Sequence, residues 1–132
     1  MSDEFKIEIV NPESSYLIKE DVIEVVVPAF EGEMGILKDH ISIISFLKPG
    51  VIKIFSKSNE DNYYVEDGIV EFKNNCLSIL TSNIFDIKKT DNDKVRDILA
   101  KAEKEAQNQN MSDQAKYIID HKIEVLKSLT LN

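Results

Sequence analysis

The chain has 132 residues, 42% of them hydrophobic and 30% charged, with 24 acidic residues against 16 basic ones. This length suits one domain, or one compact domain with an appendage, and the apolar fraction is too high for a disordered chain. The net charge of −8 disfavours binding to nucleic acids, and no apolar run approaches the roughly 20 residues that span a bilayer.

The first two thirds of the chain carry the patterns of short β-strands. Residues 5–9 alternate apolar and charged side chains, which indicates a half-buried strand. Pro49-Gly50 predicts a turn in which glycine takes a positive φ, and Glu66-Asp67-Gly68 predicts a tight hairpin. Such spacing is typical of an antiparallel β-sandwich or flattened barrel. The other predicted strands are 22–27, 41–47, 51–55, 63–65, 69–72, 77–81 and 84–87.

The last part carries a helical pattern and has neither glycine nor proline. Apolar residues recur at helical spacing over 95–106 and over 115–129, and four amides separate the two stretches. Thr90 is expected to cap the first helix. Residues 1–90 have a net charge of −7 and residues 91–132 of −1. We therefore predict a β-sandwich over 1–88 and an antiparallel helical hairpin over 89–132, held by narrow apolar stripes and able to detach.

Few residues offer catalytic or metal-binding chemistry. His40 and His121 are the only histidines, too few for a metal site; His121 is expected to face solvent. Residues 31–35 lack the lysine and hydroxyl of a phosphate loop, so they predict a solvated acidic turn. Cys76 has no flanking bases or redox partner, and without a signal peptide a reducing compartment is expected. The sequence predicts no catalytic residue, metal or cofactor, and no enzyme activity of the chain by itself.

Three turn motifs are informative because they occur together in one particular order along the chain. They are Phe30-Glu31-Gly32-Glu33-Met34-Gly35-Ile36-Leu37 with His40, then Leu47-Lys48-Pro49-Gly50, then Asp67-Gly68-Ile69-Val70-Glu71-Phe72. With the two-helix tail they closely resemble the epsilon subunit of bacterial rotary (F-type) ATP synthases, and the resemblance covers essentially the whole chain. The family often has Pro-Gly where this chain has Lys38-Asp39, and a second glycine where Asp67 stands. Both departures are expected to change only local loop geometry.

The resemblance implies two stacked five-stranded sheets and a helical hairpin in a non-catalytic central-stalk subunit of a proton-translocating ATP synthase. Such a subunit couples the gamma subunit to the c ring, peripherally at the cytoplasmic face of the bacterial inner membrane, which it meets only through the complex. Many members inhibit ATP hydrolysis by extending their helices toward the alpha and beta subunits. The implied gamma-facing residues are Asn11, His40 and Ser45, and the implied c-ring edge is Glu31, Gly32 and Glu33.

The lysines of the predicted hairpin have two interpretations of equal weight. They either contact acidic loops on the beta subunits or belong to a solvated helix surface with pairs such as Asp97–Lys101. These residues are Lys101, Lys104, Lys116, Lys122 and Lys127.

Some members of the family bind ATP on the folded hairpin through an Ile/Leu-Asp-x-x-Arg-Ala motif and further arginines. Asp93 and Arg96 match this motif, whereas Asn92 and Asp97 replace its apolar residue and its alanine. Arg96 is the only arginine, so one side chain alone can make bidentate phosphate contacts. We predict that ATP binds in the millimolar range or not at all.

The alternative hypothesis is a free-standing β-sandwich binding module for sugars or peptides, with a helical dimerisation tail. Sugar-binding modules usually expose aromatic platforms, and the chain has no tryptophan. Co-purification with a gamma subunit would distinguish the two hypotheses.

Overall fold

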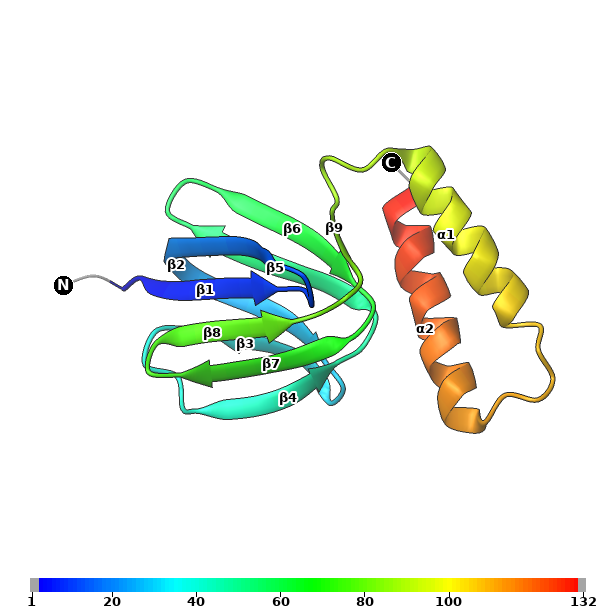
Figure 1. Cartoon of the computed structure of the whole chain (residues 1–132), viewed down its shortest axis with the longest axis horizontal. Coiled ribbons are helices and arrows are strands. Elements are labelled where there is room, and N and C mark those ends of the chain that lie inside the picture. Colours follow the sequence, from blue (N-terminus) through cyan, green and yellow to red (C-terminus); the bar gives the residue numbers. More distant parts are fainter. Residues whose placement is uncertain (1–2, 131–132) are drawn as a thin grey trace. The chain divides into compact units, whose positions relative to one another are not determined.

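Nine strands and two helices make up residues 3–130, the part of the chain that this computed structural model describes (Figure 1). The chain divides between Phe85 and Asp86 into two units. The strands form the first unit, except that the last strand ends at Asp86, and the helices belong to the second. Within residues 3–130, no helix is long and apolar enough to cross a membrane.

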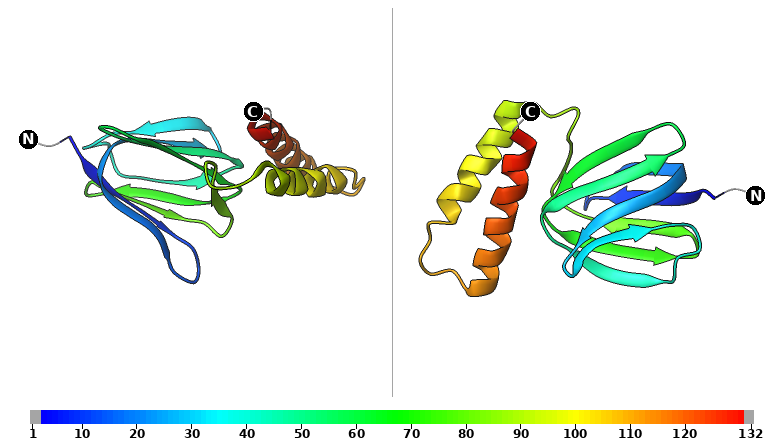
Figure 2. Two further views of the ribbon diagram at one scale, coloured as in Figure 1. Left: turned by 90° about the horizontal axis from the view of Figure 1, so that it is seen from above. Right: turned by 180° about the vertical axis from the view of Figure 1, so that it is seen from behind.

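The first unit is a sandwich of two layers (Figure 2). Its strands are β1 Phe5–Val10, β2 Ser15–Ala29, β3 Gly32–Ile36, β4 Ile43–Leu47, β5 Gly50–Ser56, β6 Glu60–Val65, β7 Gly68–Lys73, β8 Cys76–Leu80 and β9 Ile84–Asp86. The first half of the long strand β2 pairs with β1, and its second half pairs with β3 and β5. The first layer is therefore β2-β1-β8-β7-β4 and the second is β9-β6-β5-β2-β3. This confirms the predicted pair of five-stranded sheets, with β2 taking part in both.

Alternating apolar residues fill the space between the layers. In β1, Phe5, Ile7 and Ile9 are buried, whereas the residues between them are half-buried. The ring of Phe5 meets that of Phe72 edge-on, with centroids 5.6 Å apart. Each large apolar side chain buried in this way contributes roughly 1.5–3 kcal/mol to folding. The core continues through Val22, Val25, Val27, Ile36, Leu47, Ile52, Ile54, Tyr63, Val65, Val70, Leu77 and Ile79.

One strand pair departs from the predicted antiparallel arrangement. β1 and β8 are parallel, with Ile7 opposite Leu77 and Ile9 opposite Ile79. Parallel neighbours need a long connection rather than a tight turn, and here the connection comprises most of the sandwich. The prediction of wholly antiparallel sheets is thus corrected at this pair.

Two turns differ from their predictions because the chain passes between layers at them. β6 pairs with β5 whereas β7 pairs with β4 and β8, so Glu66-Asp67 does not close a hairpin. Gly68 adopts a φ of 151°, and a Cβ there would lie 2.6 Å from the carbonyl oxygen of Leu80. Gly50 does not take the expected positive φ. Close packing requires it instead, since a Cβ would lie 2.5 Å from the Cβ of Pro28.

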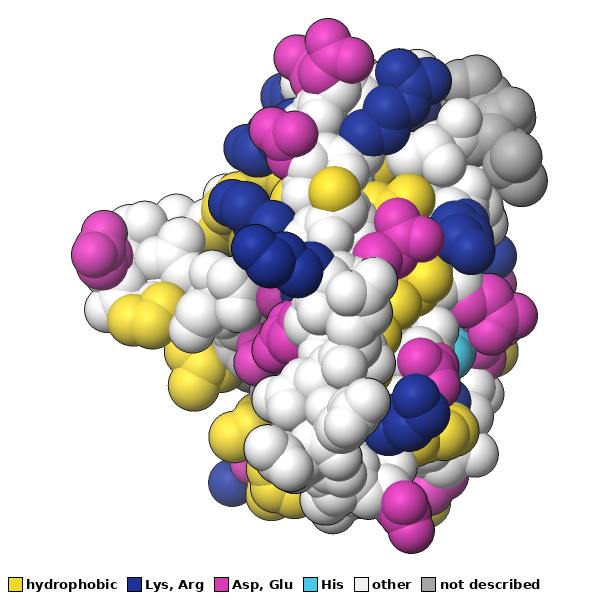
Figure 3. Space-filling view, turned by 90° about the vertical axis from the view of Figure 1, so that its right-hand side faces the viewer, with side chains coloured by type: hydrophobic (Ala, Val, Ile, Leu, Met, Phe, Trp, Pro, Cys, Tyr) yellow, Lys and Arg dark blue, Asp and Glu magenta, His cyan; other side chains and the backbone are white. Residues whose placement is uncertain are grey.

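The second unit is a hairpin of α1 Asn92–Glu105 and α2 Asp113–Thr130. Asp91 rather than Thr90 caps α1, because its carboxylate accepts a 2.8 Å hydrogen bond from the amide nitrogen of Lys94. The hydroxyl of Thr90 instead donates to the carbonyl oxygen of Asp86 at 2.8 Å. Each helix buries only two side chains. Acidic and basic side chains are interspersed over the hairpin surface that Figure 3 shows.

Candidate interaction surfaces

Four exposed apolar side chains lie next to one another on the outer face of the first layer. Across β4, β7 and β8, Phe46 lies opposite Ile69 and Ile69 opposite Leu80, while Ile44 lies two residues from Phe46 on the same face. Their exposed fractions are 69% for Ile44, 60% for Phe46, 41% for Ile69 and 48% for Leu80. We call these four residues the apolar stripe. Contiguous exposed apolar residues of this kind mark interaction surfaces.

Sequence reasoning missed the apolar stripe. A signal was present, because residues 43–47 are apolar on both faces of one strand although a sandwich buries only one face. The strand order is needed to show that Ile69 of β7 and Leu80 of β8 lie beside the exposed residues of β4.

The acidic segment at residues 31–33 is a tight turn and the start of a strand. Gly32 and Glu33 lie in β3, opposite Ala29 and Pro28 of β2, so only Phe30 and Glu31 form the turn. The prediction of a turn over residues 31–35 holds at Glu31 and is wrong for residues 32–35, because the apolar run of β2 provides a strand partner for residues 32–36. The side chains of Glu31 and Glu33 are exposed, as expected.

A predicted gamma-facing residue contacts a predicted c-ring residue. The hydroxyl of Ser45 donates a 3.3 Å hydrogen bond to the carboxylate of Glu31. Ser45 lies on the opposite face of β4 from the apolar stripe. The amide nitrogen of Phe30 also donates to the carbonyl oxygen of Phe46, at 3.1 Å. The β2–β3 turn is thereby held against β4.

Asn11 and His40 lie at opposite ends of the first layer. The side-chain oxygen of Asn11 accepts hydrogen bonds from the amide nitrogens of Glu13 and Ser14, at 3.0 and 2.9 Å, in the turn after β1. That β1–β2 hairpin projects beyond the layers in Figure 2 (left). His40 lies in the loop before β4, with its ring edge-on to Phe72 at 6.0 Å. The three predicted gamma-facing residues therefore do not form one patch.

Cys76 has basic neighbours that the linear sequence hides. Lys6 of β1 pairs with Cys76 on one side, and Lys73 of β7 pairs with it on the other. The residues that flank this free thiol in sequence, Asn75 and Leu77, are not basic, but strand pairing brings two lysines beside it.

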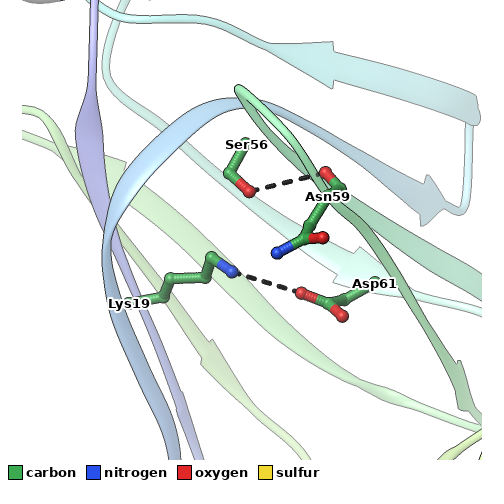
Figure 4. A network of polar contacts seen from close by, with 4 residues as sticks. All are labelled: Lys19, Ser56, Asn59 and Asp61. Carbon is green, nitrogen blue, oxygen red and sulfur yellow. Dashed lines mark hydrogen bonds and ion pairs between the residues drawn. The ribbon is translucent and has the colours of Figure 1, made fainter.

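An ion pair joins the two layers through β2 and β6, and a hydrogen bond lies within the neighbouring β5–β6 turn (Figure 4). The ammonium of Lys19 on β2 lies 3.3 Å from the carboxylate of Asp61 on β6. The hydroxyl of Ser56 donates to the carbonyl oxygen of Asn59 at 3.4 Å in the β5–β6 turn. These contacts stabilise the sandwich and provide no reactive group.

Tyr64 of β6 is 1% exposed, so its phenol is buried away from water. Burial raises the pKa of this phenol, and the charge of Glu66 raises it further. Its ring stacks on Phe85 at 4.9 Å. Tyr64 therefore stays protonated at neutral pH and offers no base. No group of three or more metal-ligating side chains gathers in the described residues.

Asp93 and Arg96, the candidate nucleotide contact, lie close to each other near the start of α1. The guanidinium of Arg96 lies 3.7 Å from the carboxylate of Asp93, and both side chains are well exposed. Asp97 and Lys101 do not form the ion pair expected of their spacing. His121 is half-buried and stacks on Tyr117, which corrects the expectation that it faces solvent.

The predicted lysines of the hairpin are spread over both helices. Lys122 is half-buried, and the other four are exposed: Lys101, Lys104, Lys116 and Lys127.

Comparison with known proteins identifies the family. Residues 4–87 match the model of the ATP synthase delta/epsilon chain β-sandwich domain. The chain is 74% identical over 129 residues to the ATP synthase epsilon chain of Pelagibacter ubique, covering 98% of this chain and 99% of that protein. It is 30% identical over 129 residues to the mitochondrial ATP synthase subunit delta of Pichia angusta, covering 96% and 79% of the two chains.

Solved structures show the same fold. A chain of the Euglena gracilis mitochondrial ATP synthase, from an OSCP/F1/c-ring assembly, matches with a TM-score of 0.75 at 19% identity, covering 98% of this chain and 81% of that one. A chain of the Tetrahymena thermophila enzyme, from a central stalk/c-ring assembly, matches with a TM-score of 0.68 at 16% identity, covering 98% of both. The resemblance inferred from the turn motifs is confirmed: the chain belongs to the ATP synthase delta/epsilon chain family.

Proposed function

We propose that this chain is a central-stalk subunit that couples the gamma subunit to the c ring of a bacterial proton-translocating ATP synthase. As a member of the family it is a subunit of the synthase and not a catalyst by itself. Its place is peripheral, at the cytoplasmic face of the inner membrane, and it meets the membrane only through the complex. This proposal replaces the alternative of a free-standing binding module.

The observation that carries the proposal is the apolar stripe, to which we assign the gamma subunit. Four large apolar side chains on three adjacent strands are 41–69% exposed. Polar residues border them, since Ile44 lies opposite Glu71 and Glu71 opposite Ser78. An apolar centre with a polar rim is the usual anatomy of a protein interface. Desolvating two or three such side chains supplies the main binding energy of many interfaces.

We assign the c ring to the β2–β3 turn. Its carboxylates, Glu31 and Glu33, are exposed and suit polar loops of a ring subunit. The Ser45–Glu31 hydrogen bond puts this turn directly beside β4. The two proposed contacts are therefore neighbours in the sandwich, which supports one rigid body that transmits torque between two partners. Asn11 and His40 remain proposed as contacts at the ends of the gamma surface.

We also propose that residues 1–88 dock to the rotor and that residues 89–132 regulate ATP hydrolysis. Each helix buries only two side chains, so the hairpin can rearrange at modest cost. Its exposed lysines suit transient contacts with acidic loops on the alpha and beta subunits.

Binding to a purified gamma subunit tests the apolar stripe. Phe46→Ser is expected to weaken binding by about tenfold to a hundredfold, because a 60% exposed ring leaves the interface. The matched control is Ile18→Ser, since Ile18 is 54% exposed and lies outside the stripe, on β2 opposite Glu8. No binding by the native chain, or equal loss in both variants, would overturn the proposal.

Cysteine crosslinking tests the c-ring contact. Glu31→Cys and Glu33→Cys in the assembled synthase are expected to form crosslinks with the polar loop of a c subunit. Crosslinks to beta subunits alone would reverse the proposed orientation of the sandwich.

A further inference from the structure

The loop between β3 and β4 is tied to the β7–β8 turn by a reciprocal pair of hydrogen bonds. The amide nitrogen of Asp39 donates to the side-chain oxygen of Asn75 at 2.7 Å. The side-chain nitrogen of Asn75 donates back to the carboxylate of Asp39 at 3.0 Å. The partners are 36 residues apart in sequence, so this contact belongs to the tertiary structure. We call it the Asp39–Asn75 clasp.

Both halves of the clasp have unusual backbone conformations. Asp39 has a φ of 66°, in the left-handed region that glycine occupies easily and other residues rarely adopt. Asn74 and Asn75 have φ values of 53° and 56°, in the two-residue turn between the paired residues Lys73 and Cys76. Such a turn needs positive φ at both central positions, which asparagine tolerates. The β7–β8 turn therefore has a backbone conformation that its two asparagines tolerate. Asp39, in contrast, depends on its hydrogen bonds to Asn75 to keep an uncommon conformation.

The clasped loop presents two apolar side chains to solvent. Leu37 is 55% exposed and Ile41 is 76% exposed, on either side of Asp39. Between them, the amide nitrogen of His40 donates to the carbonyl oxygen of Leu37 at 3.1 Å. The chain then enters β4, where Ile44 begins the apolar stripe. The loop thus continues the apolar stripe along the chain.

We propose that Asp39 and Asn75 are positioning residues of the docking surface: their clasp holds the loop so that Leu37 and Ile41 contact the gamma subunit together with the apolar stripe. This inference rests on the proposed function. A loop that is already ordered loses less conformational entropy on binding than a flexible loop does. The clasp is exposed and lies outside the strands, so its effect on docking exceeds its effect on global stability.

The test compares glycine substitutions at the two turn asparagines. Asn75→Gly keeps a positive φ available but removes both hydrogen bonds of the clasp. Asn74→Gly is the matched control, because it makes the same change one residue earlier and leaves the clasp intact. Hydrogen exchange of the Asp39 amide is expected to be about tenfold faster in Asn75→Gly only. Equal exchange in the two variants would overturn the clasp itself.

Gamma binding then separates positioning from a purely structural role. At a temperature where all variants are folded, Asn75→Gly is expected to bind the gamma subunit about five- to tenfold more weakly than Asn74→Gly. Asp39→Asn keeps an acceptor for Asn75 and tolerates the positive φ, so its affinity should match the native chain. Native binding with equal affinities of Asn74→Gly and Asn75→Gly would overturn this inference alone, whereas absence of native binding would overturn the proposed function.

Discussion

The sandwich and the hairpin differ greatly in the number of side chains that each one buries. Sixteen buried residues drawn from β1 to β8 form one core in the sandwich. In the hairpin, the buried side chains are Val95 and Ala102 of α1 and Ile119 and Leu126 of α2. A sheet held by many distant contacts is difficult to open locally, whereas a two-helix pair can change partners at small cost. This contrast is consistent with the proposed roles, a rigid coupling element in the sandwich and a movable regulator in the hairpin.

Removing the hairpin is the most drastic way to examine this contrast. A fragment of residues 1–88 is expected to keep a β-rich circular dichroism spectrum and its binding to gamma, because the core is complete without the helices. Any inhibition of ATP hydrolysis should be largely lost when this fragment replaces the full chain in the synthase. Loss of gamma binding by the fragment would show that the two units are not separable.

A cavity in the core should destabilise the sandwich strongly. Phe72→Ala removes a ring that is 1% exposed and packs on Phe5, and it should lower the free energy of unfolding by about 3–5 kcal/mol. Urea denaturation followed by circular dichroism measures the change. Phe46→Ala, which truncates an exposed ring, is the control and should change stability by less than about 1 kcal/mol.

Gly50→Ala tests close packing at the point where the chain passes between layers. Its Cβ would lie 2.5 Å from the Cβ of the buried Pro28, so we expect a loss of about 1–3 kcal/mol. Gly35→Ala should cost less, because its Cβ would meet only the flexible end of Glu24, at 3.3 Å. Thermal unfolding compares the two, and a smaller loss at residue 50 would contradict the packing argument.

A smaller effect is expected at the cap of α1. Asp91→Ala removes the acceptor for the amide nitrogen of Lys94 and should destabilise the helix by about 0.5–2 kcal/mol. Asp97→Ala, in the next turn, is the control and should have little effect. Helical circular dichroism during heating measures both. If the affinity for the gamma subunit is unchanged in Asp91→Ala, then gamma binding by the sandwich does not depend on the stability of α1.

We expect ATP to bind this chain only very weakly. The hairpin has one arginine, already paired with Asp93, so ATP should bind more weakly than about 1 mM. Isothermal titration of the full chain measures this. A micromolar dissociation constant that Arg96→Ala abolishes would contradict the prediction.

Local patterns predicted most strands and both helices, but not two segments that depend on distant partners. Residues 15–21 mix polar and apolar side chains, and they form the first half of β2 because β1 pairs with them. Residues 32–36 contain two glycines, yet they form β3 against the apolar run of β2. The cap of α1 was misplaced by one residue, since both Thr90 and Asp91 can accept an amide hydrogen bond.

The sequence by itself determined the fold class, the helical hairpin and the family, because hydrophobic periodicity and turn residues are local properties of the chain. Only the tertiary structure decided the strand order, and with it every juxtaposition between strands. The parallel β1–β8 pair places Lys6 beside Cys76, and the order β4-β7-β8 assembles the apolar stripe. The Asp39–Asn75 clasp likewise joins two loops that are distant in sequence. Side chains become neighbours through such pairings, and a pairing is settled by the packing of the whole core rather than by any one segment.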